Sequence, residues 1–190
     1  MTTEIKDAIA KAKDLRLHRE GPTNLDKIIE ILNDEKNVRI VVNAIDFNKY
    51  DLKDAGALII PYELNGDSDK NPTGIFIALN KKLDKKRQRF SLAHELGHLA
   101  LDHIDLKKIS LLNVSHHIHY DLNEVCCRDG DSMIEKRENA ANAFAQELLM
   151  PEDLIQSLTK GKYFYSDLAQ YFNVSELAAR ARIKNLKDMA

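Results

Sequence analysis

The sequence has 190 residues, a length at which one domain with a small appendage is the expectation. Hydrophobic residues make up 44% and charged residues 31% of the chain, which supports a folded core and excludes a disordered or linker protein. The net charge of -2 excludes a general attraction to nucleic acid or anionic lipid, so a nucleic-acid contact would need a local basic patch.

The amino-terminal part of the chain is predicted to form two helices followed by three strands. Apolar residues at helical spacing predict a helix from Thr3 to about Arg19, which Gly21 and Pro22 end, and a second helix that starts near Asn24. Segments rich in Ile, Val or Phe are predicted as the strands of a small mixed sheet: Val38 to Phe47, Gly56 to Tyr62 and Gly74 to Asn80. Turn residues precede the last strand, so we expect the last two strands to pair as a hairpin.

The rest of the chain is predicted to be mainly helical. The predicted helices cover Lys86 to Asp102, Ser132 to Met150, Glu152 to Thr159, Ser166 to Phe172 and Ser175 to Lys187. Because the strands precede the main helices as a block, the fold class is predicted to be α+β. We expect residues 1–150 to form the core and residues 151–190 to form a helical module that resembles a helix-turn-helix.

The cysteines and the hydropathy of the sequence indicate the cellular compartment of the protein. Cys126 and Cys127 are neighbours, so they cannot close a stabilising loop, and buried or idle thiols in a reducing compartment are the better interpretation. The longest apolar run, Ile75 to Leu79, is too short to span a bilayer, and the amino terminus lacks the apolar stretch of a signal peptide. The expectation is a cytoplasmic protein without a membrane partner.

A His-Glu-x-x-His motif, formed by His94, Glu95 and His98, lies inside a predicted helix. Histidines four residues apart share one helix face, so both imidazoles can reach one tetrahedral Zn²⁺. Glu95 is then placed to act as a general base toward a water molecule. The alternative, two ordinary surface histidines, fits poorly with the apolar residues around the motif. We therefore predict one Zn²⁺ per chain.

A catalytic zinc site needs three protein ligands and one open position. The metzincin pattern is excluded, because it requires Gly and His where this sequence has Leu101 and Ile104. His103 is one residue out of register, and we expect it to be a surface residue at a helix end. Glu138 is the predicted third ligand, and Glu135, one turn earlier on the same predicted helix, is the reserve candidate.

Asn142 lies one turn after Glu138 on the same predicted helix face. Metal-binding histidines are commonly oriented by an acceptor on their second ring nitrogen. We therefore predict that Asn142 is the hydrogen-bond partner of the zinc ligand His94. An ordinary polar residue on the helix surface is the alternative.

Two segments, Arg87 to His98 and Glu138 to Pro151, closely resemble the ImmA/IrrE family of metallopeptidases, and they occur in the family's order. The resemblance extends from the strand that begins at Gly74 to the segment that ends at Ser175. It implies a zincin-like fold with a Glu-zincin site, in which His94, His98 and Glu138 bind the metal and Glu95 is the general base.

The same resemblance implies a function. Family members cleave or inactivate helix-turn-helix transcriptional repressors in bacteria, mobile elements and phages, and thereby release stress or excision genes. The implied partner is such a repressor, acting as a protein substrate. The alternative is a non-catalytic transcriptional regulator or toxin-antitoxin partner that uses this fold to bind protein or DNA. The complete set of zinc and base residues favours the enzyme.

The sequence offers two candidate segments for substrate binding and catalysis besides the metal site. If the strand from Gly74 to Asn80 forms an exposed edge, its backbone could pair with an extended peptide. The candidates nearest in the chain for stabilising the oxyanion belong to one segment, which contains His116, His117, His119 and Tyr120. A solvated loop is the alternative for that segment.

Basic residues gather near the carboxyl end of the sequence, at Arg180, Arg182, Lys184 and Lys187. Contact with DNA phosphates is one interpretation of this modest patch. A packing or substrate-docking module is the favoured interpretation, because helical hairpins commonly have the same shape.

Overall fold

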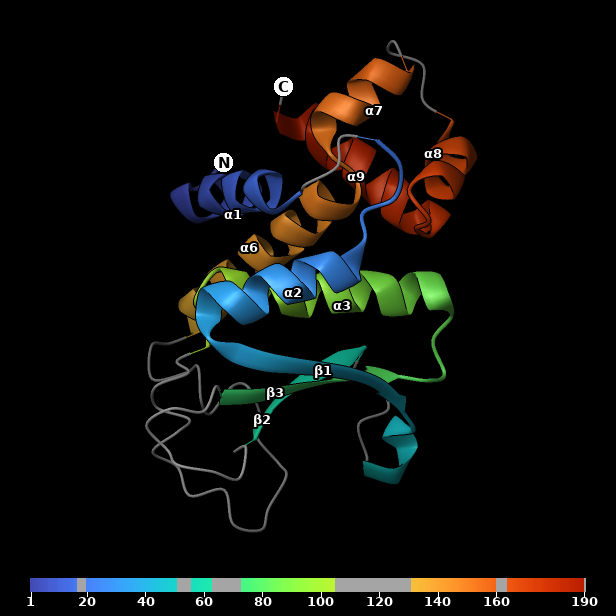
Figure 1. Ribbon diagram of the computed structural model, residues 1–190. Coiled ribbons are helices and arrows are strands. Elements are labelled where there is room, and N and C mark those ends of the chain that lie inside the picture. The colour runs from blue at the N-terminus through green and yellow to red at the C-terminus, as the bar shows by residue number, and fades with distance from the viewer. Residues whose placement is uncertain (17–19, 51–55, 63–72, 105–130, 160–163, 190) are drawn as a thin grey trace.

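The computed structural model describes residues 1–16, 20–50, 56–62, 73–104, 131–159 and 164–189. Figure 1 shows a small sheet with helices stacked above one face, so the predicted α+β class is confirmed. In chain order the elements are α1 (Thr3–Leu15), α2 (Leu25–Lys36), β1 (Val38–Ile45), the 3-10 helix η1 (Phe47–Tyr50), β2 (Ala57–Tyr62), β3 (Thr73–Asn80), α3 (Lys85–Ala100), α6 (Asp131–Leu149), α7 (Glu152–Thr159), α8 (Tyr165–Tyr171) and α9 (Glu176–Met189).

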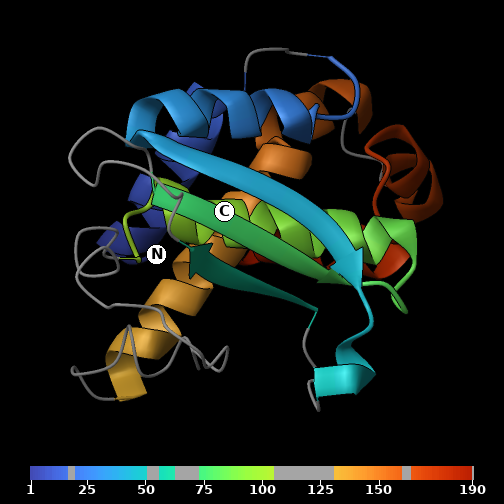
Figure 2. The same cartoon turned by 60° about the horizontal axis from the view of Figure 1, so that its bottom comes forward.

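The sheet has the strand order β1-β3-β2, with β3 in the middle (Figure 2). β3 pairs antiparallel with β2, as predicted, and parallel with β1. The prediction of β3 as an exposed edge for a substrate is therefore wrong, because both of its sides are occupied. The sequence carries no signal for the parallel partner. Ile75 and Ile77 are fully buried, as expected of a core strand.

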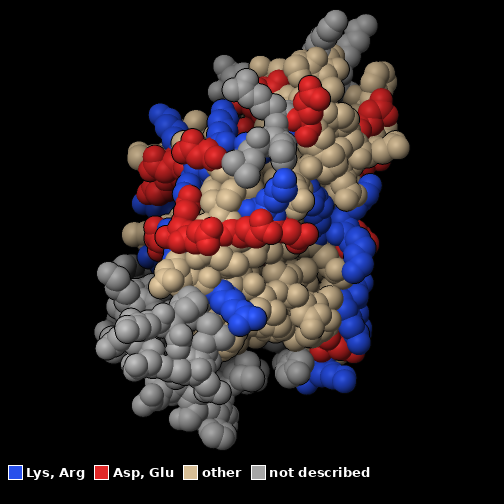
Figure 3. All heavy atoms as spheres, in the orientation of Figure 1, with Lys and Arg blue, Asp and Glu red and all other residues tan. Residues whose placement is uncertain are grey.

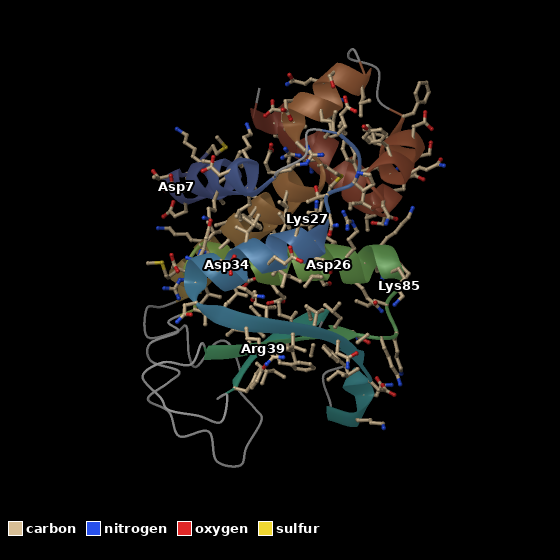
Figure 4. The ribbon with its side chains drawn as sticks, in the orientation of Figure 1. Asp7, Asp26, Lys27, Asp34, Arg39 and Lys85 are labelled. Carbon is tan, nitrogen blue, oxygen red and sulfur yellow. The ribbon has the colours of Figure 1, made fainter. Side chains whose placement is uncertain are left out.

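β1 shows the alternation of a strand with one covered face. Val38 and Ile40 are buried, whereas Arg39 and Val41 are exposed. Figure 4 places Arg39 on the side of the sheet away from the helices. The strand ends at Ile45, two residues earlier than predicted, because Phe47 begins η1 and is fully buried there.

Side-chain caps set the starts of the helices that flank the sheet. The Asn24 side chain accepts hydrogen bonds from the first backbone amides of α2, and Asp84 does the same for α3. α1 ends at Leu15, where Arg16 leaves the helical conformation, so the predicted extension to Arg19 is wrong. The other helix boundaries lie within one to two residues of those predicted.

α6 packs against both α1 and α3 (Figure 1), and its carboxyl-terminal half carries one apolar face. Its fully buried apolar residues are Ala140, Ala141, Phe144, Ala145, Leu148 and Leu149. The sequence predicts this face from helical spacing. Because α3 also packs on the sheet, the contact between α3 and α6 lies directly above the strands.

The turn between α8 and α9 is a compact one. Asn173 has a φ of 53°, and the Val174 amide donates to the Ala169 carbonyl over 2.9 Å, the pattern of a Schellman helix ending. Val174 is fully buried beneath the turn. This geometry joins two helices tightly, and the helix-turn-helix character of the module stays a prediction.

Arg182 of α9 is buried, so the hypothesis that it contacts DNA phosphates is wrong. Its guanidinium pairs with the buried Glu147 carboxylate and donates from Nε to the Met150 carbonyl over 3.0 Å. Sequence alone does not separate it from Arg180, which is more than half exposed. Only packing shows that Arg182 ties α9 to the end of α6.

The surface charge is distributed unevenly despite the small net charge. In Figure 3 acidic side chains form a band over α2, and Lys and Arg gather along the edge where α3 begins. Figure 4 shows Lys85 at that end of α3, far along the helix from its carboxyl end. No described helix combines the length and apolar character that a membrane span requires.

Candidate metal centre

The His-Glu-x-x-His motif occupies the carboxyl-terminal half of α3 (Lys85–Ala100). Its two imidazoles lie on the face that meets α6, with ring centroids 4.8 Å apart and the rings edge to face. The His94 side chain is 16% exposed and the His98 side chain 10% exposed. The helical spacing thus brings both rings to one point beside α6.

Glu138 reaches the same point from α6. Its Oε2 lies 3.2 Å from His94 Nε2, its Oε1 lies 3.3 Å from His98 Nε2, and the two Nε2 atoms are 3.0 Å apart. A tetrahedral Zn²⁺ with bonds of about 2.0 to 2.1 Å separates its ligand atoms by about 3.3 Å. The observed spacing therefore fits a zinc ion bound by these three residues.

The reserve ligand, Glu135, is not part of this group. Within the described residues, the cluster able to hold a metal consists of His94, His98 and Glu138. Glu135 is exposed one turn earlier on α6. The Glu138 side chain is itself 50% exposed, so the site is open on the α6 side.

Asn142 makes the contact predicted for it. Its Oδ1 lies 3.0 Å from Nδ1 of His94, while Nε2 of the same ring faces Glu138. An amide oxygen accepts a hydrogen bond from a protonated Nδ1, which leaves Nε2 available for a metal. The spacing of Glu138 and Asn142 on one helix face is therefore sufficient to explain this arrangement.

His103, expected from the sequence to be a surface residue at a helix end, contacts one of the candidate metal ligands. It is partly buried, and its Nδ1 lies 3.1 Å from Nδ1 of His98. Burial, together with the charges of His98 and Arg137, lowers the pKa of His103 to about 4. Counting along a regular helix misses this contact, because α3 ends before His103 and the backbone folds back there.

Glu95 points into the protein interior beside the metal ligands. It is 6% exposed, and its Oε2 finds no hydrogen-bond partner among the described residues. A buried carboxylate oxygen without a partner is costly unless a ligand completes its contacts. Burial raises the pKa of Glu95 against the opposing charges of His94 and His98, and the Glu138 carboxylate adds a smaller upward effect. Both features fit a general base that exchanges a proton with a bound water molecule.

The charges within the site stabilise one another. Hydrogen bonds from His94 and His98 hold the pKa of Glu138 far below its usual range, against the opposing effect of burial. For His94, burial favours the neutral ring, but the Glu138 and Glu95 carboxylates outweigh it and raise the pKa. The Glu138 carboxylate thus carries the negative charge that both histidines contact.

Gly97, between the two histidines, allows α3 and α6 to approach closely. A Cβ atom at this position would lie 3.0 Å from Cδ1 of Phe144 and 3.3 Å from the Ala141 carbonyl oxygen. Both distances are shorter than ordinary van der Waals contacts. The absence of a side chain at Gly97 therefore helps to set the distance between the histidines and Glu138.

We expect Gly97→Val to push α6 away from α3 and to weaken metal binding. Overpacking of this kind costs about 1 to 3 kcal/mol of folding free energy. Urea unfolding of the metal-free protein measures that cost. A zinc titration measures the loss of affinity that is expected when Glu138 moves away from the two histidines. Gly97→Ala is the graded control, because its single methyl group requires a smaller movement. Unchanged zinc affinity in Gly97→Val would contradict this role of Gly97.

The predicted oxyanion candidates His116, His117, His119 and Tyr120 lie outside the described residues, as do Cys126 and Cys127. The described part of the site therefore comprises three candidate metal ligands, a buried carboxylate and a polar partner for each histidine. Such a set can bind a metal ion, hold water and move a proton.

Comparisons with known proteins agree with this geometry. The family model of the IrrE N-terminal-like domain, Peptidase_M78, matches residues 64–184. Among solved structures, a Mycobacterium tuberculosis transcriptional regulator is similar over 93% of this chain and 44% of its own, with a TM-score of 0.52 and 17% sequence identity. This chain therefore spans less than half the length of that relative. No curated protein matches the sequence.

Proposed function

The chain belongs to the ImmA/IrrE family, Peptidase_M78, and we propose that it is a zinc-dependent endopeptidase. The observation that carries the proposal is the site itself. Three ligand atoms have the spacing of a tetrahedral zinc ion, and a buried carboxylate oxygen beside them lacks a partner among the described residues. A protein that used the metal only for structure would have no need of that carboxylate.

In this proposal His94, His98 and Glu138 hold the zinc ion. Bound Zn²⁺ makes water acidic enough to be deprotonated near neutral pH and polarises a carbonyl group. Glu95 takes the proton from the attacking water at Oε2, which has no hydrogen-bond partner among the described residues, and returns it to the leaving amine. Asn142 keeps the His94 ring in the orientation that its ligand role requires.

The proposed substrate is a helix-turn-helix transcriptional repressor. The resemblance to the family suggests this class of substrate. Among the described strands, β1 and β2 each pair on one side only, and the edge strand β2 packs against α3, the helix that carries the two histidines. We propose β2, in place of β3, as the strand that pairs with the substrate backbone.

We retain the division into a core, residues 1–150, with a zincin-like fold, and a helical module, residues 151–190. The buried pair of Arg182 and Glu147 supports a packing role for the module. Leu158 and Phe164, both well exposed, line a cavity of about 210 Å³ between α7 and α8. That apolar surface is better suited to a protein than to DNA phosphates.

Metal analysis and a cleavage assay test the proposed function together. The purified protein is expected to contain one zinc per chain, which His94→Ala and Glu138→Ala lose because each removes one of three ligands. Glu135→Ala is the matched control on α6 and should keep its zinc. The zinc-loaded protein is expected to cut a helix-turn-helix repressor encoded beside its gene at a defined bond, and a chelator should stop the reaction.

Three other outcomes would contradict or extend the proposed function. A protein that binds the repressor and zinc but never cleaves would support the alternative, a non-catalytic regulator with the same fold. A protein that binds no zinc would exclude the metallopeptidase. DNA binding that weakens steeply with salt would support a DNA-binding role for the carboxyl-terminal module.

A further inference from the structure

The chain reverses direction immediately after α3, and this reversal brings His103 back over the helix. Asp102 has a φ of 55°, and its amide donates to the Leu99 carbonyl over 3.3 Å. The His103 amide donates to the carbonyl of His98 over 3.0 Å. These two bonds are those of a Schellman motif, in which a left-handed residue ends the helix. The backbone itself therefore fixes the position of His103.

The His103 side chain faces the outer edge of the His98 ring. The two Nδ1 atoms are 3.1 Å apart, and the ring centroids are 5.1 Å apart with the rings at 65°. Nε2 of His98 lies on the opposite side and faces His94 and Glu138. His98 thus lies between the candidate metal position and His103.

We propose that His103 is a positioning residue for the metal site, in which its Nδ1 accepts a hydrogen bond from Nδ1 of His98. A neutral histidine that binds a metal through Nε2 carries its hydrogen on Nδ1. That hydrogen requires an acceptor, and His103 lies where an acceptor is needed. His103 must then carry its own hydrogen on Nε2. This inference rests on the proposed metal site.

The arrangement matches that of the other histidine. Asn142 holds Nδ1 of His94 from α6, and His103 holds Nδ1 of His98 from the turn after α3. Each candidate ligand ring is therefore fixed from its outer side by a separate element. Partners of this kind typically change metal affinity or activity by about 10- to 100-fold when they are removed.

Two variants of His103 separate an orienting hydrogen bond from simple packing. His103→Leu fills similar space without an acceptor, whereas His103→Gln supplies an amide oxygen, as Asn142 does for His94. Zinc affinity is measured by competition with a chromophoric chelator, and Co²⁺ absorption reports the ligand geometry. We expect zinc binding to weaken by about 10- to 100-fold in His103→Leu and to recover largely in His103→Gln.

Asp102→Gly is the matched control in the same turn. Glycine adopts a positive φ freely, so the turn is kept while the neighbouring side chain is removed. The removed carboxylate is 74% exposed, so its ion pair with Lys36 is screened by water and contributes little. Zinc affinity in Asp102→Gly is expected to remain near that of the unchanged protein, and urea unfolding of each metal-free variant checks that it is folded.

The outcomes distinguish this inference from the proposed function. Zinc binding by the unchanged protein together with equal affinity in His103→Leu would overturn only the role of His103. Equal weakening in His103→Leu and His103→Gln would also overturn it, because packing alone would then account for the loss. An unchanged protein that binds no zinc would overturn both proposals.

Nitrogen NMR of the unchanged, zinc-loaded protein gives a readout that does not depend on any variant. The expected spectrum has the hydrogen of His98 on Nδ1 and that of His103 on Nε2. A hydrogen on Nδ1 of His103 would contradict the proposal, since that nitrogen could not then accept the bond.

Discussion

Glu95→Gln is expected to bind one zinc per chain and to lose repressor cleavage. The amide has the size of the carboxylate but cannot take a proton from water, and general acid-base catalysis typically contributes about 10²- to 10⁴-fold to a rate. Zinc should be retained, because Glu95 is outside the group of candidate ligands. Elemental analysis gives the zinc content, and single-turnover cleavage gives the rate.

The control for this experiment is Glu135→Gln, which makes the same chemical change on an exposed side chain of α6. It is expected to leave both zinc content and cleavage unchanged. Cleavage at the unchanged rate by Glu95→Gln would exclude Glu95 as the general base. Loss of zinc in Glu95→Gln would instead show that the buried carboxylate is needed to form the site.

Arg182→Ala is expected to cause the largest loss of stability among the substitutions considered. The Arg182 side chain is 2% exposed and Glu147 1% exposed, so the substitution leaves a buried carboxylate without its main partner. Breaking a buried pair from one side costs about 3 to 5 kcal/mol. The lost bond to the Met150 carbonyl adds to that cost. Urea unfolding followed by circular dichroism measures the change.

Arg180→Ala is the matched control, since Arg180 lies half a turn away on the same helix. It pairs with Glu176 across one turn and lies 4.8 Å from the centre of the Tyr165 ring, but it is 58% exposed. An exposed pair contributes only about 0 to 1 kcal/mol, so a small change is expected. A stable Arg182→Ala variant with reduced DNA binding would restore the interpretation of Arg182 as a phosphate contact.

Replacing both members of the buried pair tests the cause of this loss. Arg182→Met combined with Glu147→Leu removes the charges and keeps apolar volume. Such replacements are often neutral or stabilising, so the double variant is expected to be more stable than Arg182→Ala. If the double variant is less stable than Arg182→Ala, the loss of stability comes mainly from the lost hydrogen bonds to backbone groups and not from the unpaired Glu147 charge.

Local features of the sequence predict much of the site. Two histidines four residues apart on a helix must share a face, so helical spacing alone pairs His94 with His98. The same rule places Glu138 and Asn142 on one face of a second helix. The structure shows that the two faces meet, with Asn142 on His94 and Glu138 between the histidines.

Features that depend on the end of a helix or on a distant partner are predicted poorly from the sequence. His103 is out of register by helical counting, but that counting does not apply beyond the left-handed Asp102. Arg182 is indistinguishable from Arg180 in the sequence, because burial depends on where α9 lies relative to α6. The middle position of β3 depends on β1, which is separated from it by η1 and β2.

The sequence by itself determined the fold class, most helix boundaries and the candidate metal ligands, because periodicity and side-chain chemistry are local properties. The tertiary structure decided which strand is central, which arginine is buried and that His103 faces His98. Those properties depend on contacts between distant segments or on how a helix ends. The distance between α3 and α6, set at Gly97 by its lack of a side chain, is the clearest example.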